Sequence, residues 1–170
     1  MGIGGQLVTI VVDVANVMGS RPDGWWRDRA GAAVRLHAEI ARLAASGRAI
    51  LRDEPGGPGE PGEPGENEAE QATVPGFVMV LEGAAKAAAA RLAPAEPDAQ
   101  AEPDALQPVR PGEVRVVQAA GSGDDAIVAV VRQLSGRRVV VTADRELRER
   151  CAAAGAEIRG PGWLLGLLPG

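Results

Sequence analysis

The sequence predicts an α/β fold: a three-layer domain around a mostly parallel central sheet of about five strands, with helices on both faces. Two observations predict it. Short runs rich in β-branched residues alternate along the chain with segments of helical periodicity, as in proteins with parallel sheets. Acidic residues repeatedly follow these runs, and ligands of open α/β sheets bind beyond the carboxyl ends of the strands. A chain of 170 residues suits one domain with its own core.

The elements can be placed in order along the chain. Apolar runs predict strands at 7–12, 77–81, 114–118, 138–142 and 157–159. A turn through Gly19 and Pro22 is expected to lead into a helix over 24–45, where apolar residues such as Leu36 and Ile40 recur at helical spacing. An Ala-rich segment predicts a short helix that ends at Leu92. The remaining predicted helices cover 124–134 and 145–154, and a terminal one begins at Pro161.

Two acidic stretches rich in Gly and Pro interrupt this alternation, at about 53–74 and 94–112. Closely spaced prolines prevent a stable helix, and the acids favour a solvated chain. Four successive Gly-x-y triplets from Gly56 are too few for a collagen triple helix. We therefore interpret both stretches as disordered insertions within a single domain that spans residues 1–170.

The net charge of −5 hides an uneven distribution. Of the 23 acids, 11 lie within 53–70 and 94–108, where there is no basic residue. The other 12 acids stand against all 18 basic residues, of which only Lys86 is a lysine. The chain outside the two acidic stretches is therefore basic, as expected of a protein that binds a polyanion. A GC-rich genome would also raise the number of arginines.

Cellular location is predicted from what the chain contains. Cys151 is the only cysteine, so no intrachain disulfide can form, and a reducing compartment, the cytoplasm, is expected. No apolar run reaches the roughly 20 residues of a membrane span, and we expect neither a signal peptide nor a membrane partner. The terminal WLLGLL run predicts a docked helix that covers either the domain's own core or a partner in a homodimer.

Acidic residues gather where the predicted strands end or the next helices begin. Asp13 directly follows the run Thr9–Val12, where an unpaired charge would be costly. Crowded carboxylates repel one another unless a hard divalent cation compensates them, and Mg²⁺ prefers such oxygen ligands. The sequence therefore predicts a metal site built from five acids: Asp13, Glu82, Asp124, Asp125 and Asp144.

Three motifs carry a family resemblance: DVAN from Asp13, GDD from Gly123, and VTADREL from Val141. In this order the chain resembles NYN domains of the PIN-like nuclease superfamily, particularly the bacterial YacP-like branch. The resemblance implies a PIN-like, Rossmann-like sheet with the first strand in the middle, and Mg²⁺- or Mn²⁺-dependent endoribonuclease activity. It spans most of the chain apart from the two insertions. Glu82 departs from the family, which commonly has Asp there.

On this basis Asp13, Asp124 and Asp144 are predicted to bind the metal. Glu82 and Asp125 are expected either to bind the metal through a water molecule or to orient the water that attacks the phosphate. Asn16 is expected to bind a ligand carboxylate or a phosphate oxygen, and Thr142 to hold the Asp144 loop. For RNA, we expect tryptophans to stack on bases and arginines to hold phosphates, with one tryptophan packing against the sheet instead. The residues assigned to the substrate are Asn16, Arg21, Trp25, Trp26, Arg27, Thr142 and Arg145.

Structural roles compete with these assignments. Asp124, Asp125 or Asp144 can cap a helix, and Asn16 can be a turn residue. A phosphatase of the haloacid dehalogenase type needs a second Asp where this chain has Ala15. The alternative function is a catalytically silent RNA- or protein-binding module of the same fold. The RNA substrate, a ribosome or protein partner, and the number of metals stay open.

Overall fold

The computed structural model describes residues 7–48, 50–52, 72–92 and 108–169. Within them, five parallel strands form one sheet in the order β5-β4-β1-β6-β7. Their bounds are Val8–Asp13 (β1), Gly76–Leu81 (β4), Val114–Gln118 (β5), Arg137–Val141 (β6) and Glu157–Arg159 (β7). The predicted fold class is confirmed, and so is the central position of the first strand. Such an order brings the carboxyl ends of β4, β1 and β6 side by side.

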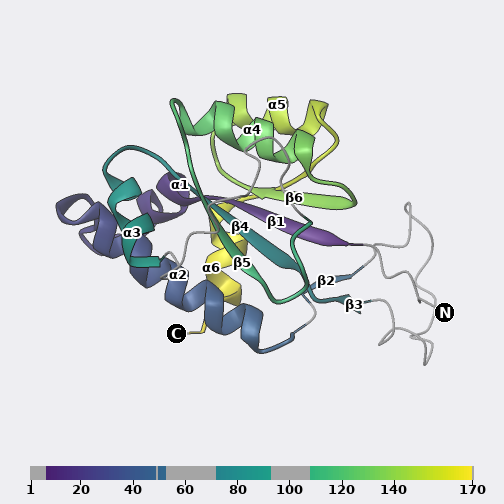
Figure 1. Cartoon of the computed structure of the whole chain (residues 1–170), viewed down its shortest axis with the longest axis horizontal. Coiled ribbons are helices and arrows are strands. Elements are labelled where there is room, and N and C mark those ends of the chain that lie inside the picture. The colour runs from purple at the N-terminus through teal and green to yellow at the C-terminus, as the bar shows by residue number, and fades with distance from the viewer. Residues whose placement is uncertain (1–6, 49, 53–71, 93–107, 170) are drawn as a thin grey trace.

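Helices cover both faces of this sheet (Figure 1). On one face, α2 (Arg29–Ala45) and α6 (Pro161–Leu167) pack on the side chains of Ile10 and Val12. On the other, α4 (Gly123–Gln133) and α5 (Arg145–Ala153) pack around Val11. With both faces covered, every residue of β1 and β4 is buried, which explains why these strands read as continuous apolar runs.

The segment after β1 differs from the predicted turn. A short helix, α1 (Val14–Gly19), begins directly after Asp13, whose carboxylate accepts a hydrogen bond from the Asn16 N–H. The prediction of a helix from residue 24 was also too early. Trp25–Arg27 form a 3₁₀ turn, η1, and Asp28 caps α2 by accepting from the Gly31 N–H.

Two further differences concern the ends of the insertions. The Ala-rich segment is mostly 3₁₀ helix, η3 (Gly83–Ala88), followed by one turn of α3 (Ala89–Leu92). A two-stranded antiparallel hairpin, β2 (Leu51–Arg52) with β3 (Ala72–Thr73), was not predicted. Val109 is buried, so the last part of the second acidic stretch belongs to the fold. Residues 53–71 and 93–107 lie outside the described residues, and their disorder stays a prediction.

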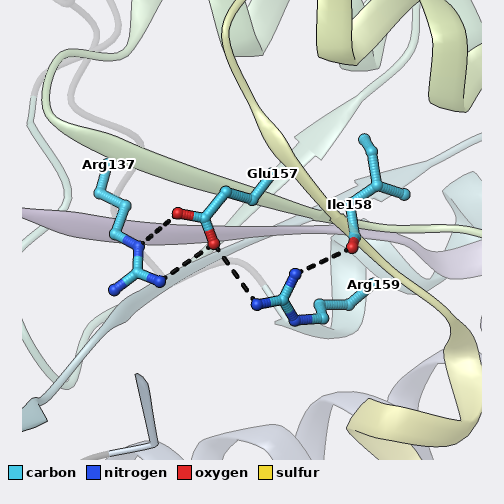
Figure 2. A network of polar contacts seen from close by, with 4 residues as sticks. All are labelled: Arg137, Glu157, Ile158 and Arg159. Carbon is cyan, nitrogen blue, oxygen red and sulfur yellow. Dashed lines mark hydrogen bonds and ion pairs between the residues drawn. The ribbon is translucent and has the colours of Figure 1, made fainter. Parts of the chain in front are cut away.

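The outer edge of the sheet carries an ion-pair network across β6 and β7 (Figure 2). Glu157 receives two hydrogen bonds from Arg137, with Nε–Oε1 and Nη2–Oε2 distances of 2.7 and 3.0 Å. Arg159 adds a contact of 3.5 Å from its Nη2 to Oε2 of the same carboxylate. We call these three residues the edge network. Among the described residues, no helix is long and apolar enough to cross a membrane.

Candidate active site

Asp13 lies at the end of the central strand and is 8% exposed. Both of its oxygens are engaged: Oδ1 accepts from the Asn16 N–H at 3.3 Å, and Oδ2 accepts from the Thr142 hydroxyl at 3.0 Å. Thr142 itself is fully buried. Asp13 therefore starts α1 and also ties β1 to the end of β6, which fixes its carboxylate at the carboxyl edge of the sheet.

Asn16 and Thr142 hold the loop between β6 and α5. The Asn16 side-chain oxygen accepts from the Ala143 N–H at 2.8 Å, and the Thr142 hydroxyl accepts from the Asp144 N–H at 3.1 Å. Asp144 in turn caps α5, because its Oδ1 accepts from the Leu147 N–H at 2.8 Å. The helix-cap interpretation of Asp144 is thus correct as a description of its geometry. None of the hydrogen bonds between described residues uses its second carboxylate oxygen.

Glu82, just after β4, reaches the start of α4. Its Oε2 accepts from the Gly123 N–H at 2.7 Å. The contact requires glycine, because a Cβ at position 123 would lie 2.0 Å from that oxygen. Ser122 is the N-cap of α4, with its hydroxyl 3.4 Å from the Asp125 N–H. Asp124 lies in the first turn of α4 and is not the cap, contrary to the structural alternative for it.

The electrostatics show which carboxylates are coupled. The pKa of Asp13 is raised from 3.8 to about 6, mainly by burial; the hydrogen bonds from Thr142 and Asn16 oppose the shift, and the charges of Glu82 and Asp124 contribute to it. The pKa of Asp124 is also raised, first by burial and then by Asp144 and Glu82, while Arg150 opposes the shift. We call Asp13, Glu82, Asp124 and Asp144 the acidic cluster. The topology brings together four of the five predicted acids.

Asp125 behaves differently from the cluster. It is exposed, and its Oδ1 forms an ion pair with Nη2 of Arg150 at 2.7 Å. The charges that act most on Asp13 and Asp124 belong to other residues. Glu146, which the sequence interpretation overlooked, does raise the pKa of Asp124. Because Glu146 lies in the first turn of α5 in the DREL motif, its spacing from Asp144 was the available signal.

The cluster suits a hard divalent cation in the chemistry of its donors. All four members are carboxylates, and their mutual repulsion would be relieved by a positive charge. Within the described ranges, however, no group of three or more His, Cys, Asp or Glu residues is close enough to hold a metal ion by itself. Because Mg²⁺ is typically held by one or two carboxylates plus waters and substrate phosphate, the donors present fit that mode of binding and not a closed protein cage.

The tryptophans and arginines predicted to bind the substrate differ in how exposed they are and in whether they are already paired. Trp25 is partly buried against the core, as expected for one of the two tryptophans, whereas Trp26 is 56% exposed. Arg27 approaches the ring of Trp26, with the guanidinium carbon 6.0 Å from the ring centre. Arg21, by contrast, is paired with Glu39 of α2. Arg145 lies on α5 with its side chain 94% exposed, within 3.6 Å of Glu149.

The five-stranded parallel sheet with helices on both faces is an α/β fold consistent with a PIN-like, Rossmann-like architecture. No protein family profile matches the chain, and no curated protein matches it in sequence. Among solved structures, it is similar to Rae1 (YacP) from Bacillus subtilis, with 13% identity and a TM-score of 0.53. The match covers 95% of this chain and 75% of the other. At that identity the likeness shows a shared fold, in agreement with the YacP-like resemblance of the motifs.

Proposed function

We propose that the protein is a metal-dependent endoribonuclease that hydrolyses phosphodiester bonds of RNA with Mg²⁺ or Mn²⁺. The observation that carries the proposal is the acidic cluster: four carboxylates from separate segments lie at one edge of the sheet, where burial first, and their mutual repulsion second, raise the pKa of Asp13 and Asp124. An arrangement that costs folding free energy is expected where function needs it.

Each side chain has a role in this proposal. Asp13, Asp124 and Asp144 bind the metal, and Glu82 orients the attacking water or binds through water. A bound metal would lower the pKa of a coordinated water and offset charge on the phosphate. Thr142 fixes the Asp13 carboxylate, while Asn16 holds the Asp144 loop through its oxygen. This leaves the Asn16 NH₂ as a donor for a ligand carboxylate or phosphate oxygen.

Asp125 contributes indirectly. Its ion pair with Arg150 places a guanidinium beside the cluster, where Arg150 lowers the pKa of Asp124. Asp125 thus helps to position a positive charge near the metal ligand Asp124. A water-mediated contact of Asp125 with the metal stays a prediction.

RNA is favoured as the polyanion for three reasons. The chain outside its acidic stretches is basic, the motifs resemble those of NYN domains, and the fold is similar to that of Rae1 (YacP). The proposals of a metal site and of an RNA substrate are consistent with each other. A phosphate of the RNA would complete the coordination sphere of a metal ion that the protein carboxylates fill only in part.

A catalytically silent RNA-binding module is the second candidate. It is favoured by one observation, the lack within the described ranges of three acidic, His or Cys residues close enough to hold a metal alone. Thermal unfolding with and without Mn²⁺ separates the two. A ligand that binds the native state raises the melting temperature, by an amount that grows with the logarithm of its concentration over Kd. A silent module predicts no shift, and an active site predicts one that Asp124→Asn reduces.

The activity itself is tested with purified protein and mixed RNA, in Mn²⁺ or Mg²⁺, beside Asp124→Asn as the control. We expect cleavage by the wild type, loss of cleavage with EDTA, and little cleavage by the variant. Asp124 is suited to this test because none of the described hydrogen bonds uses its side chain as a helix cap. Equal cleavage by both proteins would indicate a contaminating nuclease and reject the proposal.

A further inference from the structure

The segment between α1 and α2 presents the most exposed large apolar side chain of the described residues, Trp26. Leu7, just before β1, is the other large hydrophobic residue that is exposed among the described residues, at 36%. More than half of Trp26 stays exposed, so the fold gains only part of the free energy that full burial of this side chain would provide. We propose that Trp26 is a stacking platform for an unpaired base of single-stranded RNA.

The ring is held in place. Trp25, its neighbour, packs against the core, with its ring 3.7 Å from a Cβ position at Gly19. The two indoles meet edge to face, with centres 6.2 Å apart and planes at 88°. Gly24, at a φ of 76°, makes the turn that sets both rings, since other residues rarely adopt this conformation. A rigid platform loses little entropy when a base stacks on it.

Charge around the platform favours a phosphodiester chain. Arg27 lies against the Trp26 ring at 6.0 Å, and Arg29 lies against the Trp25 ring at 5.4 Å. Among the ion pairs of the described residues, neither arginine takes part. The two acids nearby are occupied by backbone: Asp23 accepts from the Trp25 N–H and Asp28 from the Gly31 N–H. Both guanidiniums are therefore available to phosphates that flank a stacked base.

The platform also lies within reach of the acidic cluster. Asp13 caps the start of α1, and Trp25 contacts Gly19 at its end. A helix of six residues is about 9 Å long at 1.5 Å per residue, a span of two or three stacked nucleotides at about 3.4 Å each. A single RNA strand of a few nucleotides that stacks on Trp26 is thus long enough to extend along α1 toward the cluster. The inference rests on the proposed RNA substrate, but not on cleavage.

The test is binding of a short single-stranded RNA by the full chain in EDTA, where no cleavage occurs. Trp26→Ala should weaken binding by roughly five- to 150-fold, the range for loss of one stacked base, and Trp26→Phe should lose less. Leu7→Ala is the matched control, because it removes the other exposed apolar side chain and should leave affinity unchanged. Binding to a blunt RNA duplex, whose bases are paired, should change by less than about twofold in every variant.

Fluorescence gives a second measurement. Stacking should quench tryptophan emission when RNA is added, and most of that quenching should vanish in Trp26→Phe. The inference is overturned if Trp26→Ala binds the single strand as wild type does, if it weakens the duplex equally, or if the wild type binds no RNA. If RNA is cleaved and neither binding nor cleavage depends on Trp26, the nuclease proposal is kept and the stacking platform is rejected. Binding that depends on Trp26 without cleavage would leave the platform standing and reject the nuclease.

Discussion

Carboxylates occur at two places on this sheet, and their surroundings are opposite. In the edge network, Glu157 pairs with Arg137 and Arg159 (Figure 2), and the hydrogen bonds from Arg137 lower the pKa of Glu157. In the acidic cluster, Asp13 is buried, with the like charges of Glu82 and Asp124 near it, and burial is the main cause that raises its pKa to about 6. One sheet therefore carries a compensated acid at its outer edge and uncompensated acids at the end of its central strand.

The two groups of carboxylates have opposite effects on the stability of the folded state. A paired, half-exposed carboxylate such as Glu157 favours the folded state slightly. A buried and crowded one such as Asp13 opposes folding until a proton or a cation neutralises it. Against the repulsion within the cluster, Arg150 is the basic residue that lowers the pKa of Asp124. The acidic cluster is therefore where we expect an external cation to bind. Four predictions test the contrast between this cluster and the edge network.

The largest effect is expected from Asp144→Asn, which should reduce metal-dependent RNA cleavage by roughly a hundredfold or more, because a metal ligand loses its charge. Asparagine is as good an N-cap as aspartate, so α5 and the melting temperature should be retained. Asp144→Ala removes the cap as well and should cost about 1 kcal/mol of stability. Cleavage rates and thermal melts of both variants separate the chemical role from the structural one. Full activity in Asp144→Asn would remove Asp144 from the site.

The second prediction concerns pH and Asp13. Its folded pKa, about 6, exceeds its ordinary value of 3.8. The stability this group contributes is therefore complete below pH 4 and is lost as pH rises through 6, by about 3 kcal/mol in all. Asp13→Asn lacks this decline, so the difference in unfolding free energy between wild type and variant should shrink or reverse from pH 4 to 7. Urea unfolding across this range measures it.

Mn²⁺ sharpens that measurement. At pH 7, where Asp13 is ionised, the ion should restore part of the lost stability in the wild type and much less in Asp13→Asn. A difference between the two proteins that stays flat with pH would contradict the raised pKa of Asp13. A flat profile with a normal response to Mn²⁺ would place the metal away from this carboxylate.

The third prediction tests the contact between Glu82 and α4. In Gly123→Ala the new methyl would lie 2.0 Å from Glu82 Oε2, so the carboxylate must move and lose its hydrogen bond. We expect a loss of about 1–2 kcal/mol in stability and a lower cleavage rate. Gly121→Ala is the matched control, since a Cβ there has open space. If both variants behave alike, Glu82 is not fixed by this contact.

The parts of the fold that were predictable from sequence are those with strong local patterns. The strand at 114–118 was predicted with the bounds that the structure gives, and the apolar run from Leu7 marked the central strand. The helix α1 was missed because the signal for it is a single side chain, the cap made by Asp13, in a segment too short to show periodicity. The hairpin β2–β3 has only two residues per strand and no pattern of its own.

The candidate site was predictable in composition but not in its contacts. Strand order brings Asp13, Glu82 and Asp144 to one edge, and that order was expected from the family resemblance. The ion pair of Asp125 with Arg150 joins residues 25 positions apart on two helices, so no local sequence pattern predicts it. Which of two adjacent acids, Asp124 or Asp125, faces the cluster depends on the rotation of α4. That rotation is set by packing of residues such as Ile127 against the sheet.

The smallest effect is expected at the edge network. Glu157→Gln should lower stability at neutral pH by about 1 kcal/mol or less, because the Glu157 side chain is 39% exposed and water screens the pair. The folded pKa of Glu157 is lowered, so this stability is present above the unfolded pKa, near 4.5, and is lost as pH falls through the folded value. That sign is opposite to the one for Asp13. The effect should weaken in high salt, and RNA cleavage should be unchanged. Urea unfolding of Glu157→Gln at low and high salt, with cleavage measured in parallel, checks this. A fall in cleavage without a fall in stability would mean that the outer edge of the sheet also serves the substrate.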